Sequence, residues 1–237
     1  MQPMPDIPPI PKPSIADDEK CFPWNVSEEN ATAVSVARLK VPSKARHEFE
    51  KACDASRKNK FGEAEKDARG AIEKFPSYSA AWVMLGVILE EEQKPQEASD
   101  ACTHAITVDP TYLSGYLCGA ELSVRHREWQ QVLDVANLAL GLNAEGDAYV
   151  DYYRATAYFH MNNLVEAKKY ALQGMEVDVN HIDPSLYLLM AQIYAHMGDR
   201  ANAIAQLQQL LKHHADRQEE DEAKAYLATL QSQSSAE

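Results

Sequence analysis

The chain has 237 residues, of which 45% are apolar and 25% are charged, as in an ordinary soluble protein. Its formal net charge of −13 argues against nucleic acid as a partner, because phosphate binding relies on Lys and Arg, and it argues against docking on anionic membranes. No apolar run approaches the length of a membrane span, so we expect a soluble protein without a membrane-spanning segment.

No basic segment followed by an apolar one opens the chain, so we expect no secretory signal in it. A cytoplasmic location is the default expectation, and a periplasmic or extracellular location is the alternative if a signal was removed. The four cysteines, Cys21, Cys53, Cys102 and Cys118, lack metal-ligand spacing. We expect them to be reduced, with Cys102 packed as a small apolar residue, because a Cys21–Cys53 disulfide would require an oxidising compartment.

Residues 1–42 form a leader whose composition differs from the rest of the chain. Six prolines lie within residues 1–13, which favours extended polyproline II or disorder. Phe22 and Trp24 are aromatic side chains that a solvated tail does not need, and residues 33–39 alternate β-branched residues as an extended segment does. We therefore expect Phe22 and Trp24 to anchor part of the leader on the rest of the molecule.

Beyond the leader, apolar residues recur at helical spacing between short polar turns. Ser43, which follows Pro42, is the predicted N-cap of the first helix. Turn residues such as Asn59 and Gly198 separate the predicted helices. The predicted pairs are 43–58 with 61–74, 78–92 with 95–107, 112–125 with 129–141, 147–161 with 164–177, and 184–196 with 200–212.

A further helix is predicted after residue 216. An acidic run over residues 219–222 precedes Tyr226 and Leu230, and acidic side chains suit the positive end of the helix dipole. We expect this helix to cover the C-terminal end of the molecule, and residues 231–237 to fray.

The most informative spacing lies in residues 79–112, which read Trp82-x-x-Leu85-Gly86-x-x-Leu89, then Ala98-x-x-x-Cys102-x-x-Ala105, then Pro110. Gly86 and Ala98 are small because two helices of one unit cross there, and Pro110 ends the second helix because it lacks an N–H. This pattern resembles the tetratricopeptide repeat (TPR), a helix-turn-helix unit of about 34 residues. Two departures are mild: Leu89 stands where the family has Tyr, and Cys102 where it has Phe.

The same frame fits five successive units, with three extra residues between units. The resemblance implies an all-α fold, a right-handed α-solenoid of stacked TPR units with a C-terminal capping helix and an extended Pro-rich N-terminal leader. The predicted domains are the leader (1–42), five TPR units within 43–216 (45–78, 79–112, 113–146, 148–181 and 184–216), and the capping helix with its tail (217–237).

The sequence contains no arrangement of residues that is typical of a catalytic site. The eight histidines form no HExxH motif and no His-x-x-x-His pair, and the chain has no Gly-rich phosphate loop. We therefore expect no enzyme activity, no catalytic residue, no metal site and no cofactor.

In the TPR family the first helix of each unit lines a concave face through repeat positions two, five, nine and twelve. Carried onto this sequence, the predicted peptide-groove residues are Phe49, Val83, Val87, Glu90, Leu117, Glu121, Val124, Tyr149, Tyr152, Thr156, Phe159, Leu188 and Gln192. No Lys or Asn occupies these positions, so the carboxylate clamp of chaperone-binding family members is absent. The rings of Tyr149, Tyr152 and Phe159 are either binding anchors or packing between neighbouring first helices.

The resemblance implies a non-enzymatic protein–protein interaction scaffold that binds an extended, partly apolar peptide or partner segment in the concave TPR groove. Its own leader is one candidate ligand, in cis or in trans. The alternative function is a self-assembling structural subunit, an oligomer or a filament, in which the leader docks on a neighbouring TPR array. The sequence does not identify an outside partner.

Overall fold

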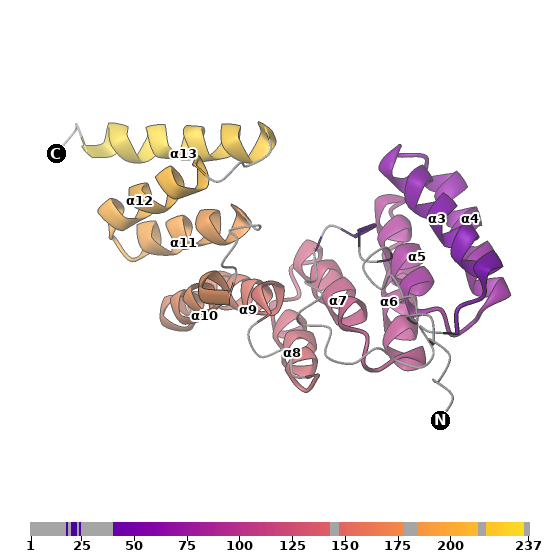
Figure 1. The fold of residues 1–237 in the computed structure, drawn as a ribbon. Coiled ribbons are helices and arrows are strands. Elements are labelled where there is room, and N and C mark those ends of the chain that lie inside the picture. The colour runs from indigo at the N-terminus through magenta and orange to yellow at the C-terminus, as the bar shows by residue number, and fades with distance from the viewer. Residues whose placement is uncertain are drawn as a thin grey trace, which may run out of the picture.

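In the computed structural model the chain folds into paired helices (Figure 1). The structure describes residues 18, 20–22, 24, 40–142, 147–177, 184–212 and 217–234, and within these ranges it contains eleven helices and no strand. The predicted extended segment 33–39 and the prolines of residues 1–13 lie outside the described residues. The helices are α3 (Ser43–Arg57), α4 (Phe61–Lys74), α5 (Ser79–Glu91), α6 (Pro95–Val108), α7 (Leu113–Arg125), α8 (Trp129–Leu140), α9 (Ala148–His160), α10 (Leu164–Val177), α11 (Pro184–His196), α12 (Arg200–Leu210) and α13 (Arg217–Ser234).

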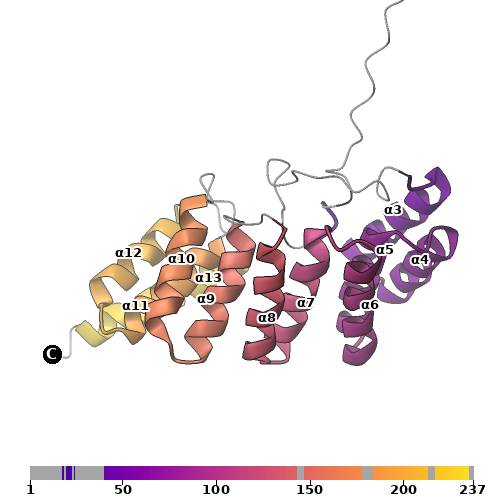
Figure 2. The ribbon, with the colours of Figure 1, turned by 90° about the horizontal axis from the view of Figure 1, so that it is seen from below.

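Each odd-numbered helix from α3 to α11 packs antiparallel against the next helix, and the pairs follow one another along an arc (Figures 1 and 2). The first helices of neighbouring pairs contact each other, while each second helix contacts the first helix of the following pair. The first helices therefore form one continuous wall, which we call the inner surface. This stack of helical hairpins is the predicted α-solenoid.

The observed helix limits lie within about two residues of the predicted ones, with two corrections. Ser43 is not the N-cap, because Pro42 holds that position with extended backbone and its carbonyl accepts the first helical hydrogen bond from Arg46 N. The fraying predicted from residue 231 is also wrong up to Ser234, because α13 continues to that residue. No Pro or Gly interrupts α13, so nothing in its sequence stops it earlier.

A residue with positive φ closes the turn inside every pair. The φ values are 56° at Asn59, 60° at Gln93, 60° at Arg127, 59° at Asn162 and 79° at Gly198. This left-handed conformation is costly for most L-residues and free of penalty for Gly. The turns recur in the frame that the sequence predicted, with the inserted residues between units.

Gly198 and Gly62 provide matched positions for testing this turn geometry, since a Cβ at either would meet no atom within 4 Å. Gly198 has φ +79°, whereas Gly62 lies in the helix α4. We expect Gly198→Ala to cost about 1–2 kcal/mol of stability and Gly62→Ala to add about 0.5 kcal/mol. Urea unfolding followed by circular dichroism measures both, and equal midpoints for the two variants would contradict the assignment.

Close crossings inside the pairs depend on small residues. An ideal Cβ at Gly86 would lie 2.6 Å from Cys102 Sγ, 3.1 Å from Cys118 Sγ and 3.2 Å from the carbonyl oxygen of Ala98. Ala98 is fully buried, as the spacing predicted. Gly86 therefore lets α5 and α6 approach to backbone contact.

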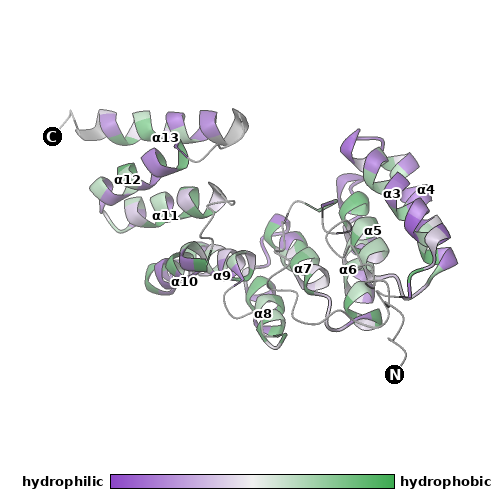
Figure 3. Ribbon diagram, viewed as in Figure 1, coloured by the Kyte–Doolittle hydropathy of each residue, from purple (hydrophilic) through white to green (hydrophobic). Residues whose placement is uncertain are grey.

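The apolar side chains are concentrated in the middle of the stack. Figure 3 shows α5 mostly green, whereas α3, α4 and α13 carry more purple, hydrophilic residues. Terminal units need a polar outer face because no further unit covers them. The apolar part of the inner surface is thus formed mainly by α5, α7, α9 and α11, and the candidate site lies on these helices.

Candidate functional site

Trp24 of the leader lies on the inner surface between α5 and α7. Its side chain is 1% exposed. It closes a small cavity of about 20 Å³, and we call the surrounding residues the upper groove: Trp24, Val87, Glu90, Cys118, Glu121, Leu122 and Arg125. A side chain from the leader thus lies among residues that the repeat frame assigned to a peptide site.

Phe22 joins Trp24 to an aromatic cluster that contains Phe49 of α3 and Tyr78. The two rings stack with centroids 5.5 Å apart, and Phe22 meets the edge of Phe49 at 6.4 Å. Phe49 in turn lies 5.3 Å from Tyr78. Phe22 is 8% exposed and Phe49 is 1% exposed, so the leader side chains complete an apolar core that α3 and α5 leave open.

Polar contacts and a disulfide fasten the same stretch. Cys21 bonds to Cys53 of α3, with a Cα–Cα distance of 5.5 Å. Arg57 Nη2 donates to the carbonyl oxygen of Lys20 at 2.9 Å, and the Tyr78 hydroxyl donates to Asp18 Oδ1 at 3.2 Å. Burial and the neighbouring Asp18 carboxylate raise the pKa of Tyr78, so its hydroxyl stays protonated and remains a donor.

The expectation of reduced cysteines is wrong in this structure, which contains no free cysteine among the four. The second disulfide joins Cys102 of α6 to Cys118 of α7, with a Cα–Cα distance of 5.7 Å. Both residues are 1% exposed, so Cys102 is buried as predicted but bonded. Helices from neighbouring pairs come close enough for this bond because Gly86 leaves room beside both sulfurs.

Ion pairs offset part of the negative charge of the upper groove. Glu121 Oε1 lies 3.0 Å from Arg125 Nε, and Arg125 Nη1 lies 2.8 Å from Glu91 Oε1. Glu90 Oε1 lies 3.3 Å from His126 Nε2. Carboxylates still outnumber permanent cations here, so this wall favours neutral or basic ligand groups over a carboxylate.

A second, open hollow of about 320 Å³ follows on the inner surface, where α7, α9 and α11 meet. We call it the lower groove, and it is lined by Val124, Tyr152, Thr156, His160, Ser185, Leu188, Leu189, Gln192, Leu210 and Glu222. Thr156 is 6% exposed, and its hydroxyl oxygen has no hydrogen-bond partner among the described residues. Burial and the charge of Arg127 lower the pKa of His160, which therefore stays neutral at pH 7.

The thirteen predicted groove residues divide into four groups. The upper groove contains Val87, Glu90 and Glu121, and the lower groove contains Val124, Tyr152, Thr156, Leu188 and Gln192. Three others are core residues, at most 1% exposed, namely Phe49, Val83 and Leu117. Tyr149 and Phe159 are half-buried and line neither hollow, and Phe159 packs edge-on against His196 at 4.9 Å.

The frame missed several lining residues. Arg125 follows Glu121 by four residues, so it lies on the same helix face and could have been included, whereas Leu122 is adjacent to Glu121 and points about 100° away from it. His160 follows Thr156 by four residues in the same way. Glu222 belongs to α13, which lies outside the repeat frame, and no sequence signal indicated that it borders the lower groove.

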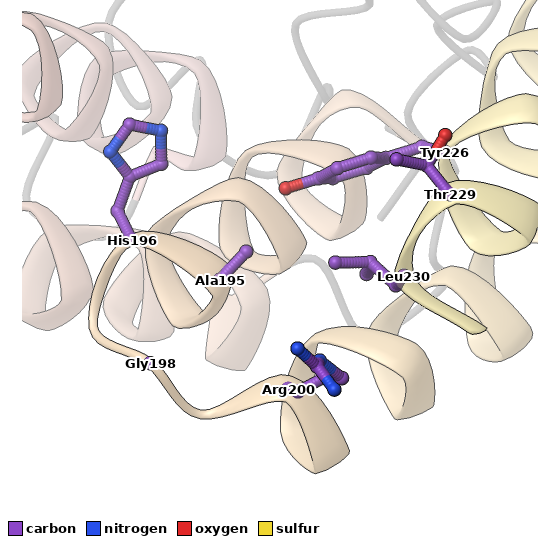
Figure 4. A pocket seen from close by; sticks show the side chains of 7 residues that line it. All are labelled: Ala195, His196, Gly198, Arg200, Tyr226, Thr229 and Leu230. Carbon is purple, nitrogen blue, oxygen red and sulfur yellow. The ribbon is translucent and has the colours of Figure 1, made fainter. Parts of the chain in front are cut away.

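The largest of these hollows, about 680 Å³, lies at the C-terminal end of the stack (Figure 4). Figure 4 shows side chains from the end of α11, the start of α12 and α13 around it, with the Tyr226 ring and Leu230 opposite Ala195 and Arg200. The full lining is Ala195, His196, Gly198, Arg200, Tyr226, Thr229 and Leu230. Burial raises the pKa of Tyr226. Sequence reasoning missed this hollow because the packing of α13 is not set by the repeat.

Within the described ranges, no group of three or more His, Cys, Asp or Glu side chains could hold a metal ion. None of the helices that the structure describes is both long and apolar enough to cross a membrane. The expectations of no enzyme activity and no cofactor remain predictions.

Two models of the tetratricopeptide repeat family match the chain, one over residues 49–111 and one over residues 185–217. Among solved structures, a thermophilic TPR protein of Thermus thermophilus superposes with a TM-score of 0.66 at 17% identity, covering 78% of this chain and 98% of that one. PilF of Pseudomonas aeruginosa gives 0.67 at 15% identity, covering 80% and 90%.

YrrB, a TPR protein with an unusual peptide-binding site, gives a TM-score of 0.52 at 20% identity, covering 73% of this chain and 88% of that one. No curated protein matches the sequence. The turn geometry, the small residues at the helix crossings and the stacked pairs agree with the two family matches. Residues 49–111 and 185–217 are thus tetratricopeptide repeat segments, and the stack that contains them has the fold of TPR proteins.

Proposed function

We propose that this protein is a non-enzymatic interaction scaffold that holds an extended, partly apolar peptide segment on its inner surface. The observation that carries the proposal is the burial of Trp24 among Val87, Glu90 and Glu121. The Trp24 side chain of the leader occupies the upper groove, which supports the proposal that this wall accepts an aromatic side chain of a bound segment.

The contacts of Phe22 and Trp24 indicate which ligand features the groove accepts. Aromatic side chains bury a large area at a low cost in rotamer freedom, and for that reason they dominate binding energies at protein interfaces. Glu90 and Glu121 at the same wall disfavour an acidic segment. The expected ligand is therefore an extended peptide with spaced aromatic or large aliphatic residues and no clustered carboxylates.

The lower groove supplies the part of the inner surface where a partner segment would bind. Tyr152 and Leu188 offer apolar surface, and the Gln192 amide can hydrogen-bond an extended backbone. Val124 lies on the same helix as Leu122 and Arg125 of the upper groove, so the two hollows border one another along α7. One ligand long enough to span both would compete with the leader.

A peptide-binding experiment in the full-length chain tests the proposal. A fluorescein-labelled peptide copying residues 20–25, with Ser in place of Cys21, is titrated into the Phe22→Ala/Trp24→Ala variant and followed by fluorescence polarisation. We expect saturable binding to this variant and at least tenfold weaker binding to the oxidised wild-type chain, whose own segment competes.

A groove substitution and a matched outer-surface substitution locate the binding. Val87→Asp, added to the variant, should abolish binding, because it places a charge where the peptide ring packs. Val165→Asp, at a position that is 71% exposed on α10, should leave binding unchanged. Binding that survives Val87→Asp would contradict the proposal, and growth of particle size with concentration in wild type would favour leader exchange between molecules.

A further inference from the structure

We propose that the Cys21–Cys53 disulfide is a redox latch that holds the leader in the upper groove, so that a dithiol reductant opens this part of the peptide site. The proposal rests on the function proposed above and names its regulation. It starts from the position of the bond, since Cys21 directly precedes Phe22, and Cys53 lies on α3 and is 3% exposed.

The non-covalent contacts of the described leader residues include the two aromatic rings, the hydrogen bonds from Arg57 to Lys20 and from Tyr78 to Asp18, and further interactions of Asp18 and Lys20. The Arg57 contact is exposed to solvent, where water competes with it. Ordering a short segment costs conformational entropy at every residue. A covalent link restricts the undocked segment and so lowers the entropy that is lost on docking, which has a large influence on whether the segment stays docked.

The two disulfides differ in their access to a reductant. Cys21 is partly exposed, whereas Cys102 and Cys118 are each 1% exposed, and Cys118 lines the cavity that Trp24 closes. Thiol–disulfide exchange requires a thiolate to reach a sulfur atom. The Cys21–Cys53 bond therefore reacts first, and the docked Trp24 shields the Cys102–Cys118 bond.

The exchange proceeds in two steps and needs an external dithiol as the reductant. A thiolate of the dithiol attacks Cys21 Sγ, which forms a mixed disulfide and releases Cys53 as a thiolate that takes up a proton. The second thiol of the reagent then attacks the mixed disulfide, which frees the Cys21 thiol and leaves the dithiol as its cyclic disulfide. Two electrons and two protons thus pass from the dithiol to the pair. A latch of this kind keeps the groove closed in an oxidising compartment.

Tryptophan fluorescence reports the state of the latch. In a full-length Trp82→Phe/Trp129→Phe variant, Trp24 is the sole tryptophan. We expect dithiothreitol to raise its quenching by neutral acrylamide severalfold and to shift its emission to longer wavelength. Alkylation and mass spectrometry show in parallel which cysteines have been reduced. In the unaltered wild-type chain, the peptide that covers residues 20–24 should exchange its amide hydrogens faster after reduction.

Two cysteine variants distinguish the effects of the two disulfides on the exposure of Trp24. Cys21→Ser should expose Trp24 with or without dithiothreitol, and Cys102→Ala/Cys118→Ala should keep the full response. The latch is refuted if Trp24 and the amides of residues 20–24 stay shielded after Cys21 and Cys53 have been alkylated. It is also refuted if the exposure of Trp24 on reduction requires the Cys102–Cys118 bond. The labelled-peptide assay on the oxidised Phe22→Ala/Trp24→Ala variant separates this failure from failure of the groove, since it requires no reduction.

Discussion

Replacing Gly86 with alanine is expected to lower the free energy of unfolding by about 2–3 kcal/mol, because the added methyl group overpacks a tight helix crossing. Its Cβ would lie 2.6 Å from Cys102 Sγ and 3.2 Å from the carbonyl oxygen of Ala98. Neither neighbour can move freely, since the sulfur is bonded to Cys118 and the carbonyl belongs to the backbone of α6. Thermal unfolding should show a loss of roughly 5–10 °C.

Gly119→Ala is the matched control, on the first helix of the next pair. A Cβ there meets Val135 Cγ1 at 3.4 Å, which is an ordinary van der Waals contact. In the interior of α7, alanine should gain about 0.5–1 kcal/mol over glycine from backbone entropy. Equal unfolding midpoints for the two variants would show that the crossing at Gly86 is less tight than described here.

Replacing Trp24 with alanine is expected to release the leader from the inner surface, since truncating a buried tryptophan costs about 3–5 kcal/mol. The free energy gained by burying the two rings and the entropy cost of ordering the segment nearly cancel. Burying Phe22 and Trp24 removes about 150–250 Å² per ring from water, worth about 8–12 kcal/mol in total. Ordering residues 18–24 costs about 7–14 kcal/mol. Loss of one ring therefore tips the equilibrium towards release.

Limited proteolysis at Lys20 measures this release, because a docked segment resists trypsin. We expect cleavage of Trp24→Ala at least tenfold faster than wild type, with circular dichroism of the helices unchanged. Trp24→Phe retains an aromatic ring and should cleave at an intermediate rate. If Trp24→Ala instead unfolded the helices, Trp24 would be a core residue of the fold and not a docked ligand group.

The fold was predictable because its signals are local and periodic. Gly86, Ala98 and Pro110 occupy fixed positions in one unit, and turn residues with positive φ recur in the same frame. The N-cap at Ser43 was misassigned because proline supplied the extended backbone that a cap requires. The continuation of α13 to Ser234 was missed because a polar helix end and a polar frayed tail have the same composition.

The candidate site was less predictable, because it depends on contacts between distant residues. The repeat frame identified Val87 and Leu188 from their helix positions alone, but it also selected Phe49 and Val83, which are buried in the core. The Cys21–Cys53 bond spans 32 residues, and nothing in cysteine spacing shows that the leader returns to α3. The two aromatic residues of the leader predict that it docks, but only the structure shows which residues they contact.

The most direct test of the account maps where a peptide binds. Methyl-labelled Phe22→Ala/Trp24→Ala protein in its oxidised form is titrated with the peptide copying residues 20–25, and chemical shifts are followed by NMR. We predict that the methyl signals of Val87 and Leu122 in the upper groove shift to saturation, while those of Val165 and Leu172, which are exposed on α10, do not move. Shifts at Val165 and Leu172 with none at Val87 and Leu122 would contradict an inner-surface peptide site.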